Sequence, residues 1–468
     1  MLRDVLTARP RVLLLAGLLL LPVAPAALDA QETRTAAENP DHARYILPSK
    51  RLQEILRTDK NYAELSNVSP DGRHFLVPRM TELSTLELMS KETYRLAGLE
   101  LRPRTDRQWH LDTWGIYDFR FYSLDRKRFV EVELPERSFF SDFTWSPDGS
   151  RIAFLAHLPT HTEVWTADPA TGRAERVSDA RVMATLGTSS QGQGSRPSRM
   201  LQWTPEGTLI TLLVPADRPE EPARDRIPAG PIVRRTREKA VPSRTYPFLL
   251  EDEHDERLFE HYTTSQIAEL APGRAPRPIG ERGMYESISV SPDGRHILAT
   301  RIERPFSYIV YHSGFPRRTV LLDREGNEVV TLATQPLRES GGWGRGGDDE
   351  ARGFAWRPDG AGLSFLKRAP RGNDGEARPY RVHLLTEPWN LDEAIVVAES
   401  EDPIRSVVYS LDGRHLFATI SKGRETALAY YDLAGDDPER RVLVPFHTND
   451  DPLALPGELM TRRTGNGV

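Results

Sequence analysis

The sequence predicts an all-β fold that is assembled from repeated hairpins. Three observations carry this prediction: a turn of the Pro-Asp-Gly type recurs six times in 468 residues, an apolar or aromatic residue precedes each copy, and a strand-like run follows it. Proline presets φ at the first central position of a β-turn, aspartate tolerates the second position, and glycine closes the turn. One such turn is a weak signal, whereas six in one chain indicate a repeat architecture.

The six copies share a core that resembles Ser-Pro-Asp-Gly. They read Val68-Ser-Pro-Asp-Gly72, Trp145-Ser-Pro-Asp-Gly149, Trp203-Thr-Pro-Glu-Gly207, Val290-Ser-Pro-Asp-Gly294, Trp356-Arg-Pro-Asp-Gly360 and Tyr409-Ser-Leu-Asp-Gly413. The strand-like runs that follow them occupy residues 74–77, 152–155, 209–213, 297–300, 363–366 and 415–418. Each copy therefore predicts a hairpin.

Further hairpins lie between the copies. They pair residues 119–124 with 129–134, 320–323 with 329–332, and 427–432 with 441–444. Two hairpins per copy make four strands, which is one blade of a propeller. We therefore predict a β-propeller of about six to seven four-stranded blades, complete or incomplete, with a short N-terminal helix and small helical insertions.

The helical and loop segments follow from the residues between the strands. Residues 48–56 predict the N-terminal helix, with Ser49 as its N-cap. The apolar residues of the segment 245–269 fit one or two short helices packed on the propeller. Successive turn acids lie further apart than the roughly 40–50 residues of a plain blade. We therefore expect long loops at 189–199, 215–243 and 339–352.

The N-terminus has the pattern of a secretory signal. Met1–Arg11 carries three arginines, Val12–Val23 is apolar, and small residues follow up to Ala30. This order predicts export to the periplasm or the extracellular space, with cleavage after Ala30 or, as the second choice, after Ala27. An uncleaved anchor is the alternative, and no later segment is apolar enough to span a bilayer.

The chain is thus expected to contain a signal peptide (1–30), a disordered segment (31–44) and a propeller domain (45–468). Its net charge of −6 is spread without large single-sign blocks, which argues against a nucleic-acid partner. The absence of cysteine excludes disulfides, thiolate catalysis and cysteine-based zinc sites. We expect no cofactor and no metal site.

The sequence offers no convincing catalytic centre. No serine lies in the Gly-x-Ser-x-Gly pattern of a nucleophile elbow, and the nearest miss, around Ser189 and Ser190, reads as a loop. His157 and His161 have the spacing of zinc ligands on a helix, but Pro159 stands between them. The glycine-rich segment 341–347 reads as a flexible loop, and the acidic segment 251–256 as a solvated helix start.

One polar cluster offers a binding site instead. Arginines and aromatic residues gather between residues 301 and 318, directly after a predicted strand. Such arginines present guanidinium forks to a carboxylate, or they stack on aromatic rings and pair with local acids to hold the blade. Both interpretations stay open. The candidate substrate-contact residues are Arg301, Arg304, Phe306, Tyr308, Arg317 and Arg318.

Strings outside the turns resemble a known family. They include Ala180-Arg-Val-Met-Ala-Thr-Leu-Gly187, Tyr262-Thr-Thr-Ser-Gln266 and Arg304-Pro-Phe-Ser-Tyr308, and the likeness extends over residues 45–463. They look like the N-terminal region of bacterial and chloroplast glutamyl endopeptidases, which belong to the prolyl oligopeptidase superfamily of serine peptidases.

The resemblance implies a propeller that caps a C-terminal α/β-hydrolase domain with Ser, Asp and His, in a branch that cleaves peptides after Glu. By this resemblance we expect the sequence to stop before such a domain and to hold none of the family's triad positions. We expect the non-catalytic propeller portion of an exported peptidase, inactive alone, with a separately encoded α/β-hydrolase domain as its partner and peptides, acidic ones included, as ligands. A propeller cut short also leaves an edge to be closed by a partner.

Two alternatives from other classes remain. The first is a free-standing Tol-B-like propeller that acts as a binding or interaction module in the cell envelope. The second is a hydrolase with an unrecognised site, for which the absent motifs leave little room.

Overall fold

The computed structural model describes residues 49–57, 67–80, 84–113, 115–188, 200–224, 246–339, 350–370, 378–434 and 440–448. Two compact units are described separately: residues 1–60, where helix α1 is the described element, and residues 61–468, which hold the strands. Within the described ranges, no helix has the length and apolar character needed to cross a bilayer. The predicted signal peptide (1–30) and disordered segment (31–44) lie outside the described residues.

Helix α1 (Lys50–Arg57) confirms the predicted N-terminal helix. The backbone N–H of Leu52 donates to Oγ of Ser49 at 3.4 Å. A serine in this position satisfies an N–H group that has no partner inside the first turn of the helix. Ser49 is therefore the N-cap, as the sequence indicates.

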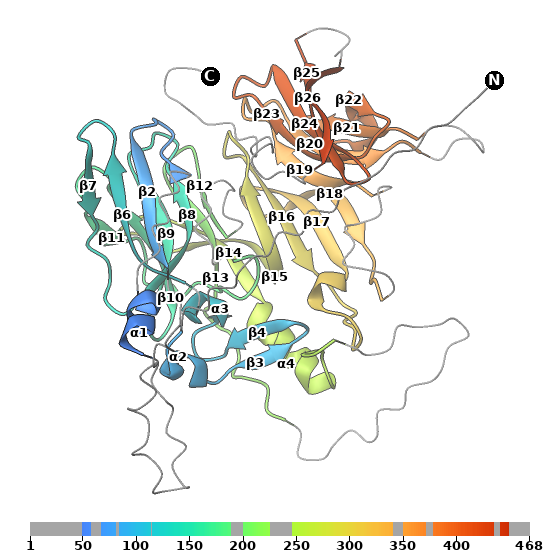
Figure 1. The fold of residues 1–468 in the computed structure, drawn as a ribbon. Helices are drawn as coiled ribbons and strands as arrows, with labels where there is room; N and C mark the ends of the chain where they lie inside the picture. Colours follow the sequence, from blue (N-terminus) through green and yellow to red (C-terminus); the bar gives the residue numbers. More distant parts are fainter. Residues whose placement is uncertain are drawn as a thin grey trace, which may run out of the picture. The chain divides into compact units, whose positions relative to one another are not determined.

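Six four-stranded antiparallel blades follow one another within the described part of residues 61–468 (Figure 1). Blade 1 consists of β1 (Asn67–Val68), β2 (His74–Met80), β6 (Ile116–Ser123) and β7 (Arg128–Glu131). Blade 2 consists of β8 (Phe139–Trp145), β9 (Ile152–His157), β10 (Thr162–Ala167) and β11 (Ala174–Arg176).

Blades 3 and 4 share the long strand β15 (Arg277–Val290). The first half of β15 pairs with blade 3 and its second half with blade 4. The other strands of blade 3 are β12 (Leu201–Trp203), β13 (Leu209–Leu213) and β14 (Ser265–Leu270). The other strands of blade 4 are β16 (His296–Ile302), β17 (Arg317–Asp323) and β18 (Glu328–Gln335).

Blades 5 and 6 are separate four-stranded sheets. Blade 5 contains β19 (Arg352–Trp356), β20 (Leu363–Arg368), β21 (Tyr380–Leu385) and β22 (Ile395–Ser400). Blade 6 contains β23 (Ile404–Tyr409), β24 (His415–Lys422), β25 (Glu425–Asp432) and β26 (Arg440–Thr448). The repeated strand order is that of a β-propeller, which confirms the predicted fold class.

Each predicted turn joins the first and second strands of one blade, as the turn of blade 2 illustrates. The N–H of Gly149 donates to the carbonyl of Ser146 at 2.9 Å, and Gly149 has φ +72°, where a Cβ would be strained. The hydroxyl of Ser146 and the N–H of Ser150 donate to the carboxylate of Asp148 at 2.6 and 3.0 Å. The aspartate thus organises the turn that its sequence motif predicts.

Neighbouring blades pack face to face through continuous apolar clusters. The cluster between blades 1 and 2 is aromatic: the ring of Phe119 lies 5.0 to 5.8 Å, centroid to centroid, from those of Phe121, Phe140, Phe143 and Phe154. Each such edge-to-face pair adds about 0.5–1.5 kcal/mol beyond the burial of its area. Similar clusters join blades 2, 3 and 4, blades 4 and 5, and blades 5 and 6.

Tryptophans that precede three of the turns also tie blades together. The indole N–H of Trp145 donates to Oδ1 of Asn67 at 2.9 Å, and that of Trp203 donates to the carbonyl of Thr144 at 2.9 Å. The indole of Trp356 reaches the carbonyl of Ser289 at 3.3 Å. In each case the acceptor belongs to the preceding blade, so the aromatic residue of the repeat serves both packing and hydrogen bonding.

An additional layer lies on the end of the blades where their second strands finish. It contains the sheet β3 (Tyr94–Leu96), β4 (Leu99–Arg102) and β5 (Arg107–Gln108), together with α4 (Glu253–Thr263) and the connection 303–316 with η1 (His312–Gly314). Three smaller elements complete the described structure: α2 (Leu86–Ser90), α3 (His110–Thr113) and η2 (Leu391–Glu393). The layer packs around Phe259, Phe306 and Phe315, which all contact one another.

The expectation of helices throughout 245–269 is wrong at its C-terminal end. Helix α4 begins after the N-cap Asp252 and ends at Thr263, whereas residues 265–270 form strand β14. Ile267 is fully buried in the cluster that joins blades 2, 3 and 4, between two antiparallel neighbours. Pairing on both sides outweighs the local helical pattern here. The three-stranded sheet β3–β5 was not predicted, because its strands are only two to four residues long.

The carboxylates of the turns make the free energy of unfolding depend on pH. Burial alone would raise the pKa of Asp293, but hydrogen bonds from Ser291 and Arg295 outweigh it and lower the pKa to about 2. A depressed pKa stabilises the folded state above the unfolded value of about 3.9, and this gain is lost as the pH falls towards 2. Because the site is partly exposed, we expect Asp293→Asn to cost only about 1 kcal/mol at pH 7.

Urea unfolding followed by circular dichroism measures this cost. The difference between the wild type and Asp293→Asn should shrink between pH 4 and pH 2, because the wild-type carboxylate is then protonated. A difference that stays constant down to about pH 2 would contradict the assignment.

Candidate functional site

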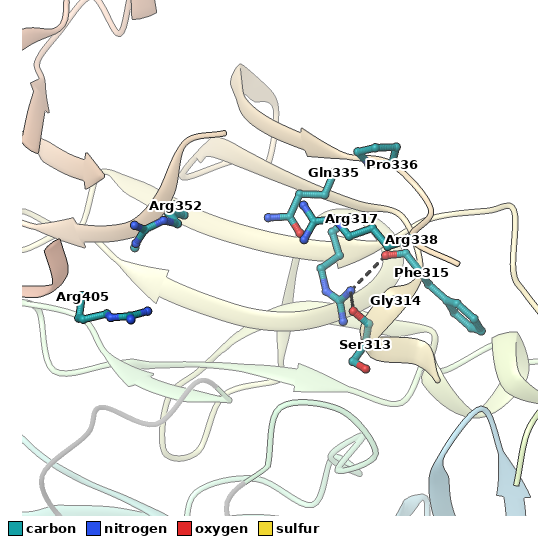
Figure 2. A pocket seen from close by; sticks show the side chains of 10 residues that line it. Ser313, Gly314, Phe315, Arg317, Gln335, Pro336, Arg338, Arg352 and Arg405 are labelled. Carbon is teal, nitrogen blue, oxygen red and sulfur yellow. Dashed lines mark hydrogen bonds between the residues drawn. The ribbon is translucent and has the colours of Figure 1, made fainter. Parts of the chain in front are cut away.

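A cationic pocket lies at the end of the blades where the first and third strands begin. It has a volume of about 330 Å³, near the lower limit for small-ligand sites. Four arginine side chains from blades 4, 5 and 6 surround it, as Figure 2 shows. The lining residues are Ser313, Gly314, Phe315, Arg317, Gln335, Pro336, Arg338, Arg352, Gly353 and Arg405.

The blade repeat itself places two of these arginines. Arg352 and Arg405 stand four residues before the aromatic residue of their turns, where β19 and β23 begin. Strand pairing is irregular at this point in both strands, between Arg352 and Ala355 and between Ile404 and Ser406. A β-bulge redirects side chains, and bulges are frequent beside functional sites. The irregular strand starts therefore set the direction of both guanidinium groups.

Arg317 is held by hydrogen bonds to Glu286 and to backbone carbonyls. Its Nε and Nη2 donate to the carboxylate of Glu286 at 2.7 and 3.0 Å. Its Nη1 donates to the carbonyls of Ser313 and Phe315 at 2.8 and 3.1 Å. The side chain is 13% exposed and that of Glu286 is 22% exposed. This bidentate pair fixes the guanidinium as part of the wall.

The other three arginines of the pocket contact an acid, a backbone carbonyl and a hydroxyl. Nη2 of Arg338 donates to Glu350 at 2.6 Å, and Nη2 of Arg352 donates to the carbonyl of Ile404 at 3.3 Å. Nε of Arg405 donates to Oγ of Ser421 at 2.6 Å, and no carboxylate of the described residues pairs with Arg405. The guanidinium of Arg405 lies in the pocket lining without a carboxylate among the described residues, and this positive group suits an anion.

The remaining sequence candidates lie outside the pocket, in contact with local partners. Arg301 donates to Glu303 at 3.1 Å, and Arg318 donates to Glu328 at 2.6 Å. Phe306 is 7% exposed inside the additional layer. Of the six candidates the structure thus brings only Arg317 to the pocket, and for the others substrate contact stays a prediction.

Arg304 and Tyr308 bind the acidic side of helix α4. The guanidinium of Arg304 donates to Glu256 and Glu260 at 2.7 and 2.9 Å and lies 4.6 Å from the ring of Phe306. The hydroxyl of Tyr308 donates to Glu256 at 2.6 Å. The hydrogen bond to Glu260, followed by that to Glu256, raises the pKa of Arg304. The acidic helix start is therefore an anchor for the connection 303–316.

Ser141 and His157 in blade 2 are as close as a catalytic serine and histidine, but both are buried. Oγ of Ser141 lies 2.9 Å from Nε2 of His157, and Ser141 donates to the carboxylate of Asp142 at 2.7 Å. Nδ1 of His157 lies 3.0 Å from Oγ1 of Thr162. Burial, with Arg107 close by, holds the pKa of His157 well below its usual range. Ser141 and His157 are 0% and 1% exposed, so no substrate reaches the hydroxyl in this arrangement.

The remaining motifs from the sequence, the histidine pair and the glycine-rich segment, form no catalytic or metal site in the described residues. His161 contacts Glu163 at 2.8 Å, so it and His157 bind different groups. Among the residues that the structure describes, no three His, Asp or Glu side chains are grouped to hold a metal ion. Ser189, Ser190 and the glycine-rich segment 341–347 lie outside the described residues.

A larger cavity of about 610 Å³ lies beside β13 and β14. Its lining includes Pro215, Pro276 and Pro278 as well as three arginines. Two of these arginines, Arg181 and Arg218, pair with the buried carboxylate of Asp106 at 2.7 and 2.6 Å. Their charge is thus used to hold the additional layer, which makes this cavity a weaker candidate for an anion.

Arg338, Arg352, Arg405 and Gln335 were missed because they are far from Arg317 in sequence. A signal for two of them exists in the repeat. The position four residues before the apolar or aromatic residue of the turn holds Glu286 in blade 4, Arg352 in blade 5 and Arg405 in blade 6. Aligning the six copies at their turns would have shown a charged residue at this position in five of them, with Ser141 of blade 2 as the exception.

Fold and site together define a β-propeller, with six blades in the part of the chain that the structure describes and a cationic pocket at one end of these blades. No protein-family model matches the chain. It is 25% identical over 451 residues to a protein named probable glutamyl endopeptidase, chloroplastic, from Oryza sativa subsp. japonica; this covers 91% of the chain and 46% of the rice protein. The protein of the same name from Arabidopsis thaliana is 25% identical over 454 residues, or 91% of the chain and 44% of that protein.

These matches confirm the predicted resemblance to the glutamyl endopeptidase branch of the prolyl oligopeptidase superfamily. The chain spans less than half of the length of the curated relatives that it matches. Among solved structures, Porphyromonas gingivalis dipeptidyl peptidase 4 is similar with a TM-score of 0.45 and 10% identity, over 85% of this chain and 47% of that one. The fold assignment rests on the strand order described above.

Arg317 and Arg405 should differ in what they contribute to stability. Arg317→Ala leaves the partly buried Glu286 without its bidentate partner, which we expect to cost about 1–3 kcal/mol. Arg405→Ala removes one hydrogen bond from an exposed side chain and should cost less than about 1 kcal/mol. Urea unfolding at neutral pH measures both values. Equal losses of stability would contradict the view that Arg317 holds the pocket wall while the guanidinium of Arg405 is available to a ligand.

Proposed function

We propose that this chain is the non-catalytic propeller portion of an exported prolyl oligopeptidase-type serine peptidase. In this role it binds peptide substrates and controls their access to an α/β-hydrolase domain, which supplies the catalytic serine. The observation that carries the proposal is the similarity to proteins named glutamyl endopeptidase along 91% of the chain. The propeller fold, with six blades among the described residues, is consistent with a gating part.

The cationic pocket supports a peptide ligand with a carboxylate. Guanidinium groups bind carboxylates through paired, charge-assisted hydrogen bonds, and Arg405 has no carboxylate partner among the described residues. The pocket also offers the aromatic ring of Phe315 and the amide of Gln335, which suit the neutral part of a peptide. An acidic side chain or a free C-terminus is therefore the group that this pocket would take.

The chain by itself is proposed to bind without cleaving. Its 468 residues contain no Gly-x-Ser-x-Gly motif, and the hydroxyl of Ser141, beside His157, is buried away from solvent. Peptide hydrolysis then requires the hydrolase domain, either on the same polypeptide or as a separate partner.

The ligand proposal predicts selective binding of acidic peptides. A peptide with blocked termini and one central Glu should bind more tightly than its Gln twin, because only the carboxylate uses the guanidinium groups. Arg405→Gln should weaken binding of the Glu peptide by about tenfold or more and leave the Gln peptide unchanged. Fluorescence anisotropy with labelled peptides measures both affinities.

Arg274→Gln is the matched control, since Arg274 is an exposed arginine in the turn between β14 and β15, outside the pocket lining. Mass spectrometry of the same samples should find both peptides intact. Equal affinity for the Glu and Gln peptides, or equal effects of the two arginine variants, would refute the assignment of the pocket. Cleavage of the peptide would refute the non-catalytic role.

Export is a separate part of the proposal, supported by the basic, apolar and small-residue order of the first 30 residues. Expression in a Gram-negative host should release a periplasmic protein that begins at Gln31, because Ala30 completes the small-residue site. N-terminal sequencing of that fraction measures the cleavage point. A start at Leu28 would indicate cleavage after Ala27, and a full-length membrane-bound product would contradict export by cleavage.

A further inference from the structure

A small pocket lies between blades 4 and 5, at the end of these blades opposite to the arginine pocket. Its lining comes from the turns that join the first and second strands of the two blades and from the connection between β21 and β22. Its volume is about 240 Å³, below the range of drug-sized ligand sites. The pocket therefore has room for one small ring or one side chain.

The turn of blade 5 leaves this space open. In blades 2 and 4 the turn glycine lies against the turn of the preceding blade: a Cβ on Gly149 would come within 3.2 Å of Asp71, and one on Gly294 within 2.8 Å of Pro205. A Cβ on Gly360 of blade 5 would meet no described atom within 4 Å. The turns of blades 4 and 5 are thus apart, and aromatic and charged side chains line the space between them.

Trp389, in the connection between β21 and β22, has a strained backbone at this pocket. Its φ is +66°, which is an outlier for a residue with a bulky side chain. Such strain persists where the surroundings impose it, and it is frequent at ligand sites. The indole ring packs edge to face on His296 and on Trp356, with 5.0 and 6.0 Å between the centroids. These three rings form the aromatic wall of the pocket.

The indole N–H of Trp389 has no acceptor among the described residues. Trp389 is only 8% exposed, but its nitrogen stays open to solvent, since it is not one of the enclosed polar atoms that lack a partner. A buried tryptophan usually has a partner for this N–H, as Trp356 has in the carbonyl of Ser289 at 3.3 Å. The pocket thus presents a fixed donor whose acceptor would come from a ligand.

Charged groups beside the aromatic wall add both donors and acceptors. Nε of Arg295 donates to Asp293 at 2.7 Å, and its Nη2 lies 3.2 Å from Oε1 of Glu387. A guanidinium has five N–H groups and a carboxylate has about four acceptor sites, so these pairs leave donors and acceptors over. The side chains of Arg295 and Glu387 are 65% and 51% exposed, so a ligand can reach them.

This mixture of groups argues against a charged ligand. A cation offers no acceptor to the N–H groups of Trp389 and Arg295, and an anion is repelled by the carboxylates of Asp293 and Glu387. A hydroxyl group both donates and accepts, so it serves both kinds of group. A pyranose ring carries several hydroxyls and presents C–H groups to aromatic rings from one face, and one such ring matches the size of the pocket.

We propose that the pocket between blades 4 and 5 binds one sugar unit. The sugar hydroxyls accept from Trp389 and Arg295 and donate to Glu387, while the ring packs on the aromatic wall. This site gives the chain a carbohydrate-binding function in addition to the proposed peptide site. It does not depend on that site, because the two pockets share no lining residue.

Saturation-transfer difference NMR of the full chain with the methyl glycosides of glucose, galactose, mannose and N-acetylglucosamine tests the proposal. At least one glycoside should bind with a Kd of about 0.1–10 mM. Ala361→Trp should abolish binding, because Ala361 is an exposed residue of the lining and an indole there would fill the pocket. Glu387→Gln and Trp389→Phe should each weaken binding about fivefold or more, since the first loses the carboxylate and the second the indole N–H.

Ser150→Trp is the matched control and should leave binding unchanged, because Ser150 follows the turn glycine of blade 2 as Ala361 follows that of blade 5, outside the pocket. The proposal is overturned if none of the four glycosides binds at about 50 mM, or if Ala361→Trp binds as the wild type does. Tighter binding of N-acetyl-lysine methylamide than of every glycoside would also overturn it, in favour of a cationic ligand. Circular dichroism melts establish that each variant is folded, and if Trp389→Phe is not, Ala361→Trp and Glu387→Gln decide.

Discussion

Face-to-face burial of antiparallel blades is the constraint on which this molecule depends. A four-stranded sheet with two apolar faces is stable in water only when both faces are covered, and blades 2 to 5 achieve this by packing between neighbours. The aromatic cluster around Phe119 and the tryptophan hydrogen bonds between blades serve the same purpose. Every blade has the same requirement because the blades repeat. The outer faces of the first and last described blades differ from it, since their side chains are only partly buried.

The same repetition places charge at one end of the blades. Strands that begin irregularly bring Arg352 and Arg405 beside Arg317, and the connections of blades 1, 3 and 4 form an additional layer at that end. Acidic side chains hold the layer and the pocket wall in place, as Glu256 does for Arg304 and Glu286 does for Arg317. Arginine thus has two uses here: it pairs with carboxylates that hold the layer, and it lines the pocket.

The sequence predicted those features that arise from local chemistry. Six turns located the first hairpin of every blade, since proline, aspartate and glycine determine a turn within a few residues. The strand β14 was expected as helix, because pairing with β13 and β15 cannot be seen in a local pattern. The pocket escaped prediction for a related reason. Arg317 was named, but its companions Arg352 and Arg405 come from other blades, and their proximity depends on how blades stack.

Strand β15 joins blades 3 and 4 by backbone hydrogen bonds, whereas blades 5 and 6 have no such strand in common with a neighbour among the described residues. Because this one strand runs through blades 3 and 4, those blades cannot part without breaking a ladder of backbone hydrogen bonds. Blades 5 and 6 are sheets of their own, held by side-chain contacts such as that of Trp356 with Ser289. The lining of the arginine pocket comes from blades 4, 5 and 6, so it spans the interface of blade 4 with blade 5 and that of blade 5 with blade 6. A small rotation of blade 5 would therefore change the distances between Arg317, Arg352 and Arg405 while every strand stayed intact. The shape of the pocket thus depends on how blade 5 packs against blades 4 and 6.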